Sequence, residues 1–312
     1  MACIREALYG VVVQTYDAAG KPIAMKRMNL QAMQQRRALR SGQRIMENGF
    51  QEIEIARRLQ HAVHDHVVHI LDVETSATEC RILMKLYSNG ELYPFIQQGR
   101  CSQAQLIRIF QDIVHGLNHL HSLNIAHLDL SLENVLLDDQ LRASICDFGL
   151  AEMNGSHCHG GRGKPLYMAP ELYRRKSFSG FQADMWSLGI LLFAMFTGCF
   201  PHQCAHDGDE HFQVLAKRGL PHLIRQWRLS ISPIVVDLLN RLLVCDPDER
   251  VTMDELISHA LIRVPSTSRV SWLTPHLPCH QCLKIVGVGH RKRVCCKRLL
   301  CMTCFSEHQC TP

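Results

Sequence analysis

The sequence contains no long uninterrupted hydrophobic run. Its longest nearly uncharged apolar stretch, from Met185 to Pro201, is broken by polar residues and glycines. That stretch is shorter than the roughly 20 apolar residues of a membrane span, so we expect a buried helix there. The N-terminus also lacks the charged-then-apolar pattern of a secretory signal peptide. These absences predict a soluble, cytoplasmic protein with no membrane span.

No compositional bias dominates the 312 residues, which are 46% hydrophobic, 20% charged and 6% aromatic, with a net charge of +5. This composition excludes a disordered, collagenous or low-complexity chain, and it supplies enough apolar residues for a sizeable core. At roughly 150 residues per domain, the length indicates about two domains.

Charge and cysteine are concentrated at the C-terminal end. Residues 265–312 contain seven of the 34 Lys and Arg residues, seven of the 15 cysteines, and a single acidic residue, Glu307. We therefore expect a body over residues 1–264, a proline-containing linker over 265–278, and a cysteine-rich tail over 279–312. Without a secretory signal, clustered cysteines favour metal binding over disulfides.

The hydrophobic pattern changes period along the body. Short apolar runs over 11–13, 23–25, 67–73 and 81–86 predict strands, and a turn signal at residues 18–20 predicts a hairpin between the first two. One helix is expected at 51–59. From Ser102, which with Gln105 forms a capping box, apolar residues recur at helical spacing, and further helices are expected at 185–196 and 235–243. The body therefore reads as a small β-rich lobe followed by a larger helical lobe, an α+β fold.

Four short motifs occur in order: Ile-Ala-Met-Lys at 23–26, His-Leu-Asp-Leu-Ser-Leu-Glu-Asn at 127–134, Asp-Phe-Gly at 147–149 and Met-Ala-Pro-Glu at 168–171. As an ordered set they are specific, and residues 4–264 resemble the eukaryotic protein kinases of the serine/threonine type. The resemblance implies a bilobal kinase fold, ATP and Mg²⁺ as cofactors, and protein substrates.

The resemblance also assigns roles to residues. It implies that Asp129 orients the substrate hydroxyl and accepts its proton, and that Lys26 holds the ATP phosphates with Glu52 as its ion-pair partner, although Glu47 and Glu54 lie nearby. Asp147 and Asn134 would bind magnesium, a cation that prefers oxygen ligands. The implied nucleotide site consists of Val12, Ala24, Lys26, Met84, Lys85, Tyr87 and Leu136.

The sequence departs from the kinase pattern at several places. Residues 5–10 read Arg-Glu-Ala-Leu-Tyr-Gly, so two of the three glycines of a phosphate-binding loop are missing. Ser131 stands where these kinases usually have a lysine for the γ-phosphate, and Lys164 stands where they usually have a threonine. Leu128 replaces the arginine that receives an activation-loop phosphate. We expect reduced activity; the alternative is a pseudokinase that serves as a binding or scaffold module.

Two carboxylates suggest a substrate preference. Glu91 and Glu133 match positions at which basophilic kinases place acidic residues, which predicts an arginine before the acceptor hydroxyl. The alternative is that Glu91 only contacts the ribose and Glu133 is a solvated charge.

The tail has the spacing of a zinc site. Cys279-x-x-Cys282 and Cys301-x-x-Cys304 supply four thiolates, enough for a closed tetrahedral site. Further candidate zinc ligands are His290, Cys295, Cys296, His308 and Cys310. The arrangement is similar to FYVE- and RING-type fingers, but the FYVE pattern is incomplete, so phosphoinositide binding is only weakly indicated. Nucleic-acid binding lacks interleaved aromatic residues. The alternative is an unfolded tail with free thiols.

Overall fold

The computed structural model describes residues 2–99, 101–174 and 177–263, with four short strand segments beyond them: β13 (Leu277–Pro278), β14 (Ile285–Val286), β15 (Arg293–Cys295) and β16 (Arg298–Leu300). The side chains of residues 264–312 lie outside this description. The predicted zinc ligands, from Cys279 to Cys310, are among them, so the zinc site stays a prediction.

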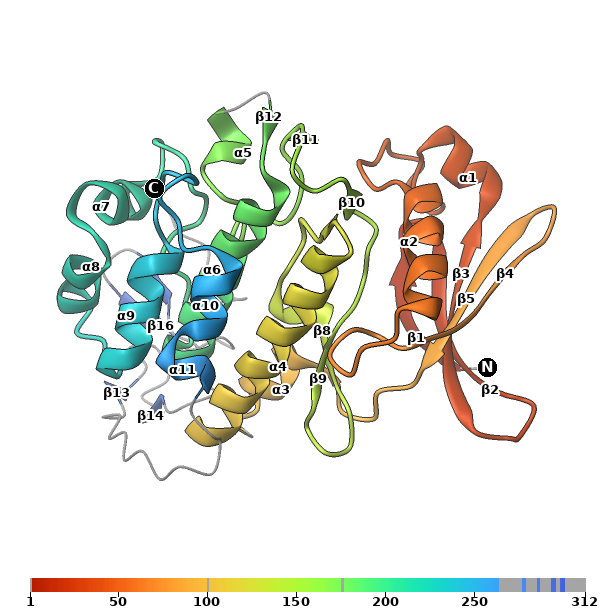
Figure 1. Ribbon diagram of the computed structural model, residues 1–312, viewed down its shortest axis with the longest axis horizontal. Coiled ribbons are helices and arrows are strands. Elements are labelled where there is room, and N and C mark those ends of the chain that lie inside the picture. Colours follow the sequence, from red (N-terminus) through yellow and green to blue (C-terminus); the bar gives the residue numbers. More distant parts are fainter. Residues whose placement is uncertain are drawn as a thin grey trace.

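A five-stranded antiparallel sheet forms one end of the molecule, with the strand order β1-β2-β3-β5-β4 (Figure 1). Helix α2 packs against it, and the short helix α1 follows β3. The elements of this N-lobe are β1 (Ala2–Ala7), β2 (Gly10–Tyr16), β3 (Pro22–Asn29), α1 (Leu30–Gln35), α2 (Gly49–His61), β4 (Ile70–Thr75) and β5 (Glu79–Lys85).

The register of this sheet places four predicted nucleotide-site residues on one face. Val12 lies opposite Lys26, and Ala24 lies opposite Met84. Because residues two apart on a strand share a face, Ala24 and Lys26 point the same way, and their cross-strand partners point with them. This face looks toward the second lobe.

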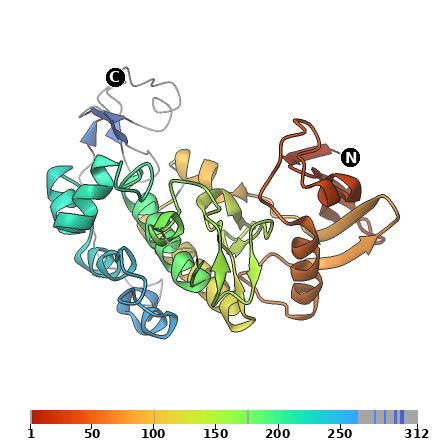
Figure 2. The ribbon, with the colours of Figure 1, turned by 90° about the horizontal axis from the view of Figure 1, so that it is seen from above.

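The C-lobe is helical and is built around two long helices, α4 and α6 (Figures 1 and 2). Helix α4 begins at the predicted Ser102–Gln105 capping box, and α6 is buried along almost its whole length. The C-lobe helices are α3 (Leu92–Gln97), α4 (Gln103–Ser122), α5 (Glu171–Arg174), α6 (Gly180–Thr197), α7 (Glu210–Arg218), α8 (Leu220–Gln226), α9 (Pro233–Leu242), α10 (Met253–Ser258) and α11 (Ala260–Arg263).

Short strands occupy the junction between the lobes. Strand β8 pairs with β6 and β9, and β7 pairs with β10. The elements here are β6 (Gly90–Glu91), β7 (Ile125–Ala126), the 3₁₀ turn η1 (Leu132–Asn134), β8 (Val135–Leu137), β9 (Ala143–Ile145) and β10 (Glu152–Met153). A further pair, β11 (Cys158–His159) and β12 (Ser177–Phe178), lies beside α5 in the C-lobe (Figure 1). The loops between them carry the polar motif residues.

A buried ion pair ties the segment after Met168 to the core of the C-lobe. Arg250 donates to both carboxylate oxygens of Glu171, at 2.8 and 3.1 Å, and also to the carbonyl of Gln182 on α6. Because Glu171 and Arg250 are both buried, this pair fixes the end of that segment against α6.

The expected α+β bilobal arrangement is present, and the structure differs in detail. The strand expected at 67–73 begins only at Ile70, because Val67 makes an isolated bridge to Ile145 in the C-lobe instead. The apolar stretch that starts at Met185 is a buried helix as far as Thr197, where α6 ends. Within the described part of the chain, no helix combines the length and apolar character that a membrane span requires.

Candidate active site

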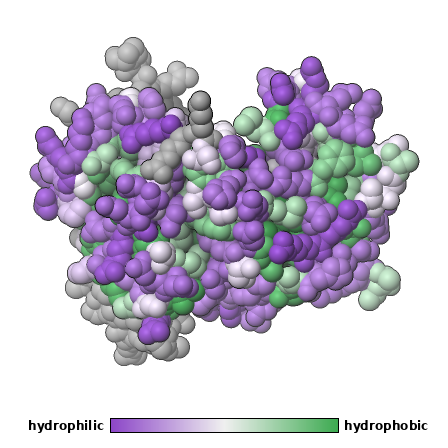
Figure 3. Space-filling model, turned by 45° about the horizontal axis from the view of Figure 1, so that its top comes forward, coloured by the Kyte–Doolittle hydropathy of each residue, from purple (hydrophilic) through white to green (hydrophobic). Residues whose placement is uncertain are grey.

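A cavity of about 430 Å³ lies between the lobes. The surface is hollowed at this junction, between two largely hydrophilic masses (Figure 3). All seven predicted nucleotide-site residues line the cavity: Val12, Ala24, Lys26, Met84, Lys85, Tyr87 and Leu136. Leu136 comes from β8 of the C-lobe, whereas Val12 and Ala24 come from the sheet, so the apolar residues face each other across a slot that suits a flat ring.

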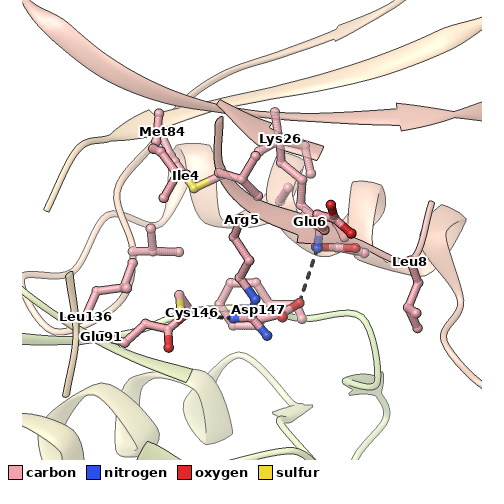
Figure 4. A pocket seen from close by; sticks show the side chains of 18 of the residues that line it. Ile4, Arg5, Glu6, Leu8, Lys26, Met84, Glu91, Leu136, Cys146 and Asp147 are labelled. Carbon is pink, nitrogen blue, oxygen red and sulfur yellow. Dashed lines mark hydrogen bonds and ion pairs between the residues drawn. The ribbon is translucent and has the colours of Figure 1, made fainter. Parts of the chain in front are cut away.

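Lys26 lies at the inner end of this slot, between two carboxylates from different elements. Its ammonium donates to Glu52 Oε1 on α2 and to Asp147 Oδ1 after β9, the latter at 3.2 Å (Figure 4). Helix α2 is capped by Asn48, whose side chain accepts from the Gln51 N–H, and this cap sets where Glu52 lies. Glu54 is exposed, so the structure pairs Glu52 rather than Glu54 with Lys26.

Charge within this cluster shifts the pKa values of its members. The Lys26 ammonium lowers the pKa of Asp147 to about 2, although burial opposes it. Burial alone would lower the pKa of Lys26, but Asp147 and Glu52 more than offset that effect and raise it. Lys26 is therefore a fixed cation and Asp147 a fixed anion at neutral pH.

The catalytic loop, residues 127–134, is held from below by one buried carboxylate. Asp184 on α6 accepts from the backbone N–H groups of His127 and Leu128, both at 2.8 Å, and from His121 Nε2 at 2.9 Å. Leu128 has a φ of 59°, a left-handed conformation that a branched apolar residue rarely adopts. Asp184 thus stabilises a backbone shape that the loop sequence alone disfavours.

Asp129 and Asn134 meet at the top of this loop. The Asn134 amide donates to the Asp129 backbone carbonyl at 2.8 Å and to Asp129 Oδ2 at 2.7 Å. Its carbonyl oxygen, Oδ1, is buried and has no hydrogen-bond partner among the described residues. A buried amide oxygen normally has a partner, so this atom is suited to an absent ligand.

The donor set fits the expected magnesium ion. The unpartnered Asn134 oxygen and the ionised Asp147 carboxylate are both hard oxygen ligands, which Mg²⁺ prefers. The pair consists of one amide and one carboxylate, and no group of three or more His, Cys, Asp or Glu side chains among the described residues could hold a metal ion.

The β1–β2 hairpin covers the cavity without the missing glycines. Gly10 remains, and a Cβ there would lie 1.9 Å from the Arg27 carbonyl oxygen, so only glycine fits. Arg5 projects from β1 into the cavity toward Asp147, and it donates to Glu91 at 3.2 Å (Figure 4).

Sequence reasoning gave no cavity role to Arg5 and weighed Glu47 only as an alternative partner of Lys26, yet both side chains line the cavity. Arg5 stands at the first position of the degraded glycine motif, which is the signal that could have found it. Glu47 lies before α2 and lines the cavity, and burial raises its pKa to about 7. No sequence pattern distinguishes Glu47 from its acidic neighbours.

The segment after Asp147 is tied to α2. Glu152 accepts from the Gln51 amide at 2.7 Å and pairs with Arg162 at 2.7 Å, and the Asn48 N–H donates to the Gly149 carbonyl at 3.0 Å. These contacts hold the helix that carries Glu52 against the C-lobe.

Known proteins share this sequence pattern. Residues 6–262 match the protein kinase domain family. The chain is 32% identical to the serine/threonine-protein kinase SRK2C of Arabidopsis thaliana over 76% of its own length and 66% of that protein. It is 34% identical to the serine/threonine-protein kinase SAPK9 of Oryza sativa subsp. japonica, over 70% of this chain and 61% of that protein.

A third relative, the CBL-interacting serine/threonine-protein kinase 13 of Arabidopsis thaliana, is 33% identical over 67% of this chain and 41% of that protein. The chain therefore spans between about two fifths and two thirds of the length of these relatives. The family match itself covers most of the chain and includes every residue of the cleft described above except Arg5. The chain belongs to the protein kinase family.

Proposed function

We propose that this chain is an ATP- and magnesium-dependent protein kinase that phosphorylates serine and threonine side chains, with reduced activity. The observation that carries the proposal is the complete polar set within one cleft: Lys26 bound to both Glu52 and Asp147, and Asn134 bound to Asp129. The relatives named as serine/threonine-protein kinases support the same conclusion.

Each side chain has a separate task in the proposed reaction. Asp129 accepts the proton of the substrate hydroxyl while the oxygen of that hydroxyl forms a bond to the γ-phosphorus of ATP. The bond from that phosphorus to the bridging oxygen breaks, and its electron pair leaves with ADP. Lys26 neutralises phosphate oxygens, and Asn134 orients Asp129. Asp147 and Asn134 would hold magnesium, which supplies further neutralisation of the polyphosphate when bound.

The reduced activity that we propose follows from the sequence of the β1–β2 hairpin, which covers the cleft. Two glycines are absent from the β1–β2 hairpin, so the backbone approaches the phosphates less closely than in a glycine loop. The alternative proposal, a pseudokinase, keeps nucleotide binding but not transfer. Both proposals share the same cavity, so a transfer assay separates them.

The test is phosphate transfer from labelled ATP to generic protein substrates, with and without magnesium. We expect the wild-type chain to label substrate, and we expect Asp147→Asn and Asp129→Asn to lose at least about 1,000-fold in rate. Asp139→Asn, at an exposed position outside the cavity lining, is the matched control and stays near wild type. Nucleotide binding without transfer above Asp147→Asn would favour the pseudokinase.

We also propose that the substrate has an arginine before the acceptor. Glu133 supports this, since its Oε2 is buried and has no hydrogen-bond partner among the described residues. Glu91 is already paired with Arg5, so it is less available to bind an arginine of the substrate. In a peptide array, Glu133→Gln should reduce arginine selectivity more than Glu91→Gln does. A wild-type array with no basic preference would contradict the proposal.

For the tail, we propose that residues 279–312 bind zinc, on the cysteine spacing alone. A segment of this size cannot build much core, so the metal would supply its folding energy. Metal analysis of the purified chain under reducing conditions tests this. We expect one to two zinc ions per chain, about half as many after Cys279→Ser and Cys301→Ser if two sites exist, and less than about one zinc overall would contradict it.

A further inference from the structure

Lys164 and Ser131 are in direct contact beside the proposed catalytic base. The Lys164 ammonium donates to Asp129 Oδ2 at 2.7 Å and to Ser131 Oγ at 3.0 Å. The Lys164 backbone N–H also approaches Asp129 Oδ1, at 3.3 Å. The three residues come from two segments, the catalytic loop and the chain that precedes Glu171, so their contact depends on tertiary structure.

The backbone is shaped to bring these segments together. Gly163 has a φ of 111°, and a Cβ at that position would lie 2.7 Å from the Leu128 carbonyl oxygen. Only glycine avoids both the strain and the clash. The backbone conformation at Gly163 therefore brings Lys164 to Asp129. A lysine that only pointed into solvent would not require this backbone conformation.

The position of the ammonium suits an incoming anion. Lys164 has three N–H donors, of which Asp129 and Ser131 use two, and its side chain is 35% exposed. Ser131 is fully buried, so its hydroxyl is a fixed anchor for the ammonium. Among the described residues, no other lysine or arginine forms an ion pair with Asp129. A cation beside the base lies where charge develops on the transferred phosphoryl group.

We infer that Lys164 is a catalytic residue that contacts the transferred phosphoryl group, with Ser131 holding its ammonium in place. Ser131 stands where the resemblance to kinases implies a lysine, and the ammonium of Lys164, from the other segment, lies beside Ser131 and Asp129. This rests on the proposed kinase function. Lys164 neutralises oxygens on the phosphorus while Asp129 takes the hydroxyl proton, and it forms no covalent bond.

A purely structural role is the competing explanation, in which Lys164 only tethers its segment to the catalytic loop. The two explanations differ in what an exchange of side chains does. A lysine at position 131 would place an ammonium beside Asp129 from the loop, and a threonine at 164 would supply the hydroxyl in return. A catalytic cation can be supplied from either segment, whereas a segment tether depends on Lys164 itself.

The experiment therefore compares Lys164→Thr, Ser131→Lys and the double exchange in the full chain, with kcat and KM measured separately. We expect Lys164→Thr to lower kcat about 100-fold with a smaller change in KM for the protein substrate. The double exchange should recover to within about 10-fold of wild type. Lys217→Met, which removes an exposed lysine far from the cleft, should have no effect.

Two activity results would overturn the inference: a Lys164→Thr enzyme with wild-type kcat, or a double exchange no more active than Lys164→Thr although it folds. Thermal unfolding checks that each variant folds. Failure of the proposed kinase function would give a different result from failure of this inference, because the wild-type chain would then transfer no more phosphate than Asp147→Asn.

Nucleotide affinity tests Lys164 even if no transfer is seen. A contact to the γ-phosphate is present in MgATP and absent in MgADP, so Lys164→Thr should weaken MgATP binding about 10-fold and leave MgADP unchanged. Equal effects on the two nucleotides, or no effect on either, would overturn the inference.

Discussion

The two sides of the cleft are built in different ways. The catalytic loop, residues 127–134, rests on the fully buried carboxylate of Asp184, which accepts from two backbone N–H groups. The β1–β2 hairpin, residues 2–16, pairs with β3 of the sheet, but two of its side chains that line the cavity, Arg5 and Glu6, form exposed or partly exposed ion pairs, with Glu91 and Arg40. Buried hydrogen bonds are costly to lose and exposed pairs are not.

This difference shows which side of the cleft has the more strictly fixed geometry. The residues that would handle the proton and the phosphoryl group belong to the buried side, where one backbone geometry is strongly favoured. The hairpin that departs from the kinase pattern belongs to the exposed side. A chain can lose loop glycines and still keep the geometry around Asp129, because the hydrogen bonds that shape this loop come from Asp184 and Asn134, which lie outside the hairpin.

The largest expected effect is at Asp184. Replacing it by alanine leaves two buried N–H groups without an acceptor and releases the left-handed Leu128 backbone, so we expect a loss of about 3 kcal/mol or more in the free energy of unfolding. Asp184→Asn keeps one acceptor oxygen and should lose less. Urea denaturation measures both, with the exposed Asp139→Ala as control. If Asp184→Ala lowered the free energy of unfolding by less than about 1 kcal/mol, the catalytic loop would not be the more strongly held side of the cleft.

A smaller, pH-dependent effect is expected from Glu47 on the N-lobe side. Burial raises its pKa from 4.5 to about 7, so the folded state binds a proton that the unfolded state releases between these values. Stability from this group is present below about pH 4.5 and is lost as the pH rises to about 7. Asp147, with its pKa lowered to about 2, acts in the opposite direction and loses its contribution only in acid.

Glu47→Gln should therefore raise the free energy of unfolding by about 1–2 kcal/mol at pH 8 and change it little at pH 5, after allowing for partial solvent exposure. Glu54→Gln, on the exposed face of α2, should leave the pH dependence unchanged. Thermal or urea unfolding at several pH values measures this, and parallel curves for Glu47→Gln and wild type would contradict it.

Next in size is the link between α2 and the segment after Asp147. Glu152→Ala removes the acceptor for both Gln51 and Arg162, and we expect kcat to fall about 10-fold as α2 loses its fixed position. Glu152→Gln retains an acceptor for Gln51 and should fall less. If Glu152→Ala keeps wild-type activity, the position of α2 does not depend on this link.

The sequence predicted the buried side of the cleft better than the exposed side. The motifs around Asp129 and Asp147 need particular side chains, so sequence and geometry agree there. Outside the cleft, the capping box predicted at Ser102 is confirmed as the start of α4. The strand expected from Val67 was wrong at its beginning, because a tertiary contact to Ile145 takes precedence over local pattern. No local pattern could place Lys164 on Asp129, since the two are 35 residues apart and meet only through the fold.

The smallest expected effect is at Arg5, and it tests what the altered hairpin contributes. Its pair with Glu91 is partly exposed, so Arg5→Ala should change the free energy of unfolding by less than about 0.5 kcal/mol. Its guanidinium nevertheless points into the cavity toward the place proposed for the phosphates (Figure 4), so MgATP binding should weaken about 3-fold. Calorimetric titration of MgATP measures this, with Arg44→Ala as an exposed control outside the cavity lining. Tighter binding by Arg5→Ala would show that the arginine competes with the nucleotide for the cavity, and the hairpin would then restrict the site that it covers.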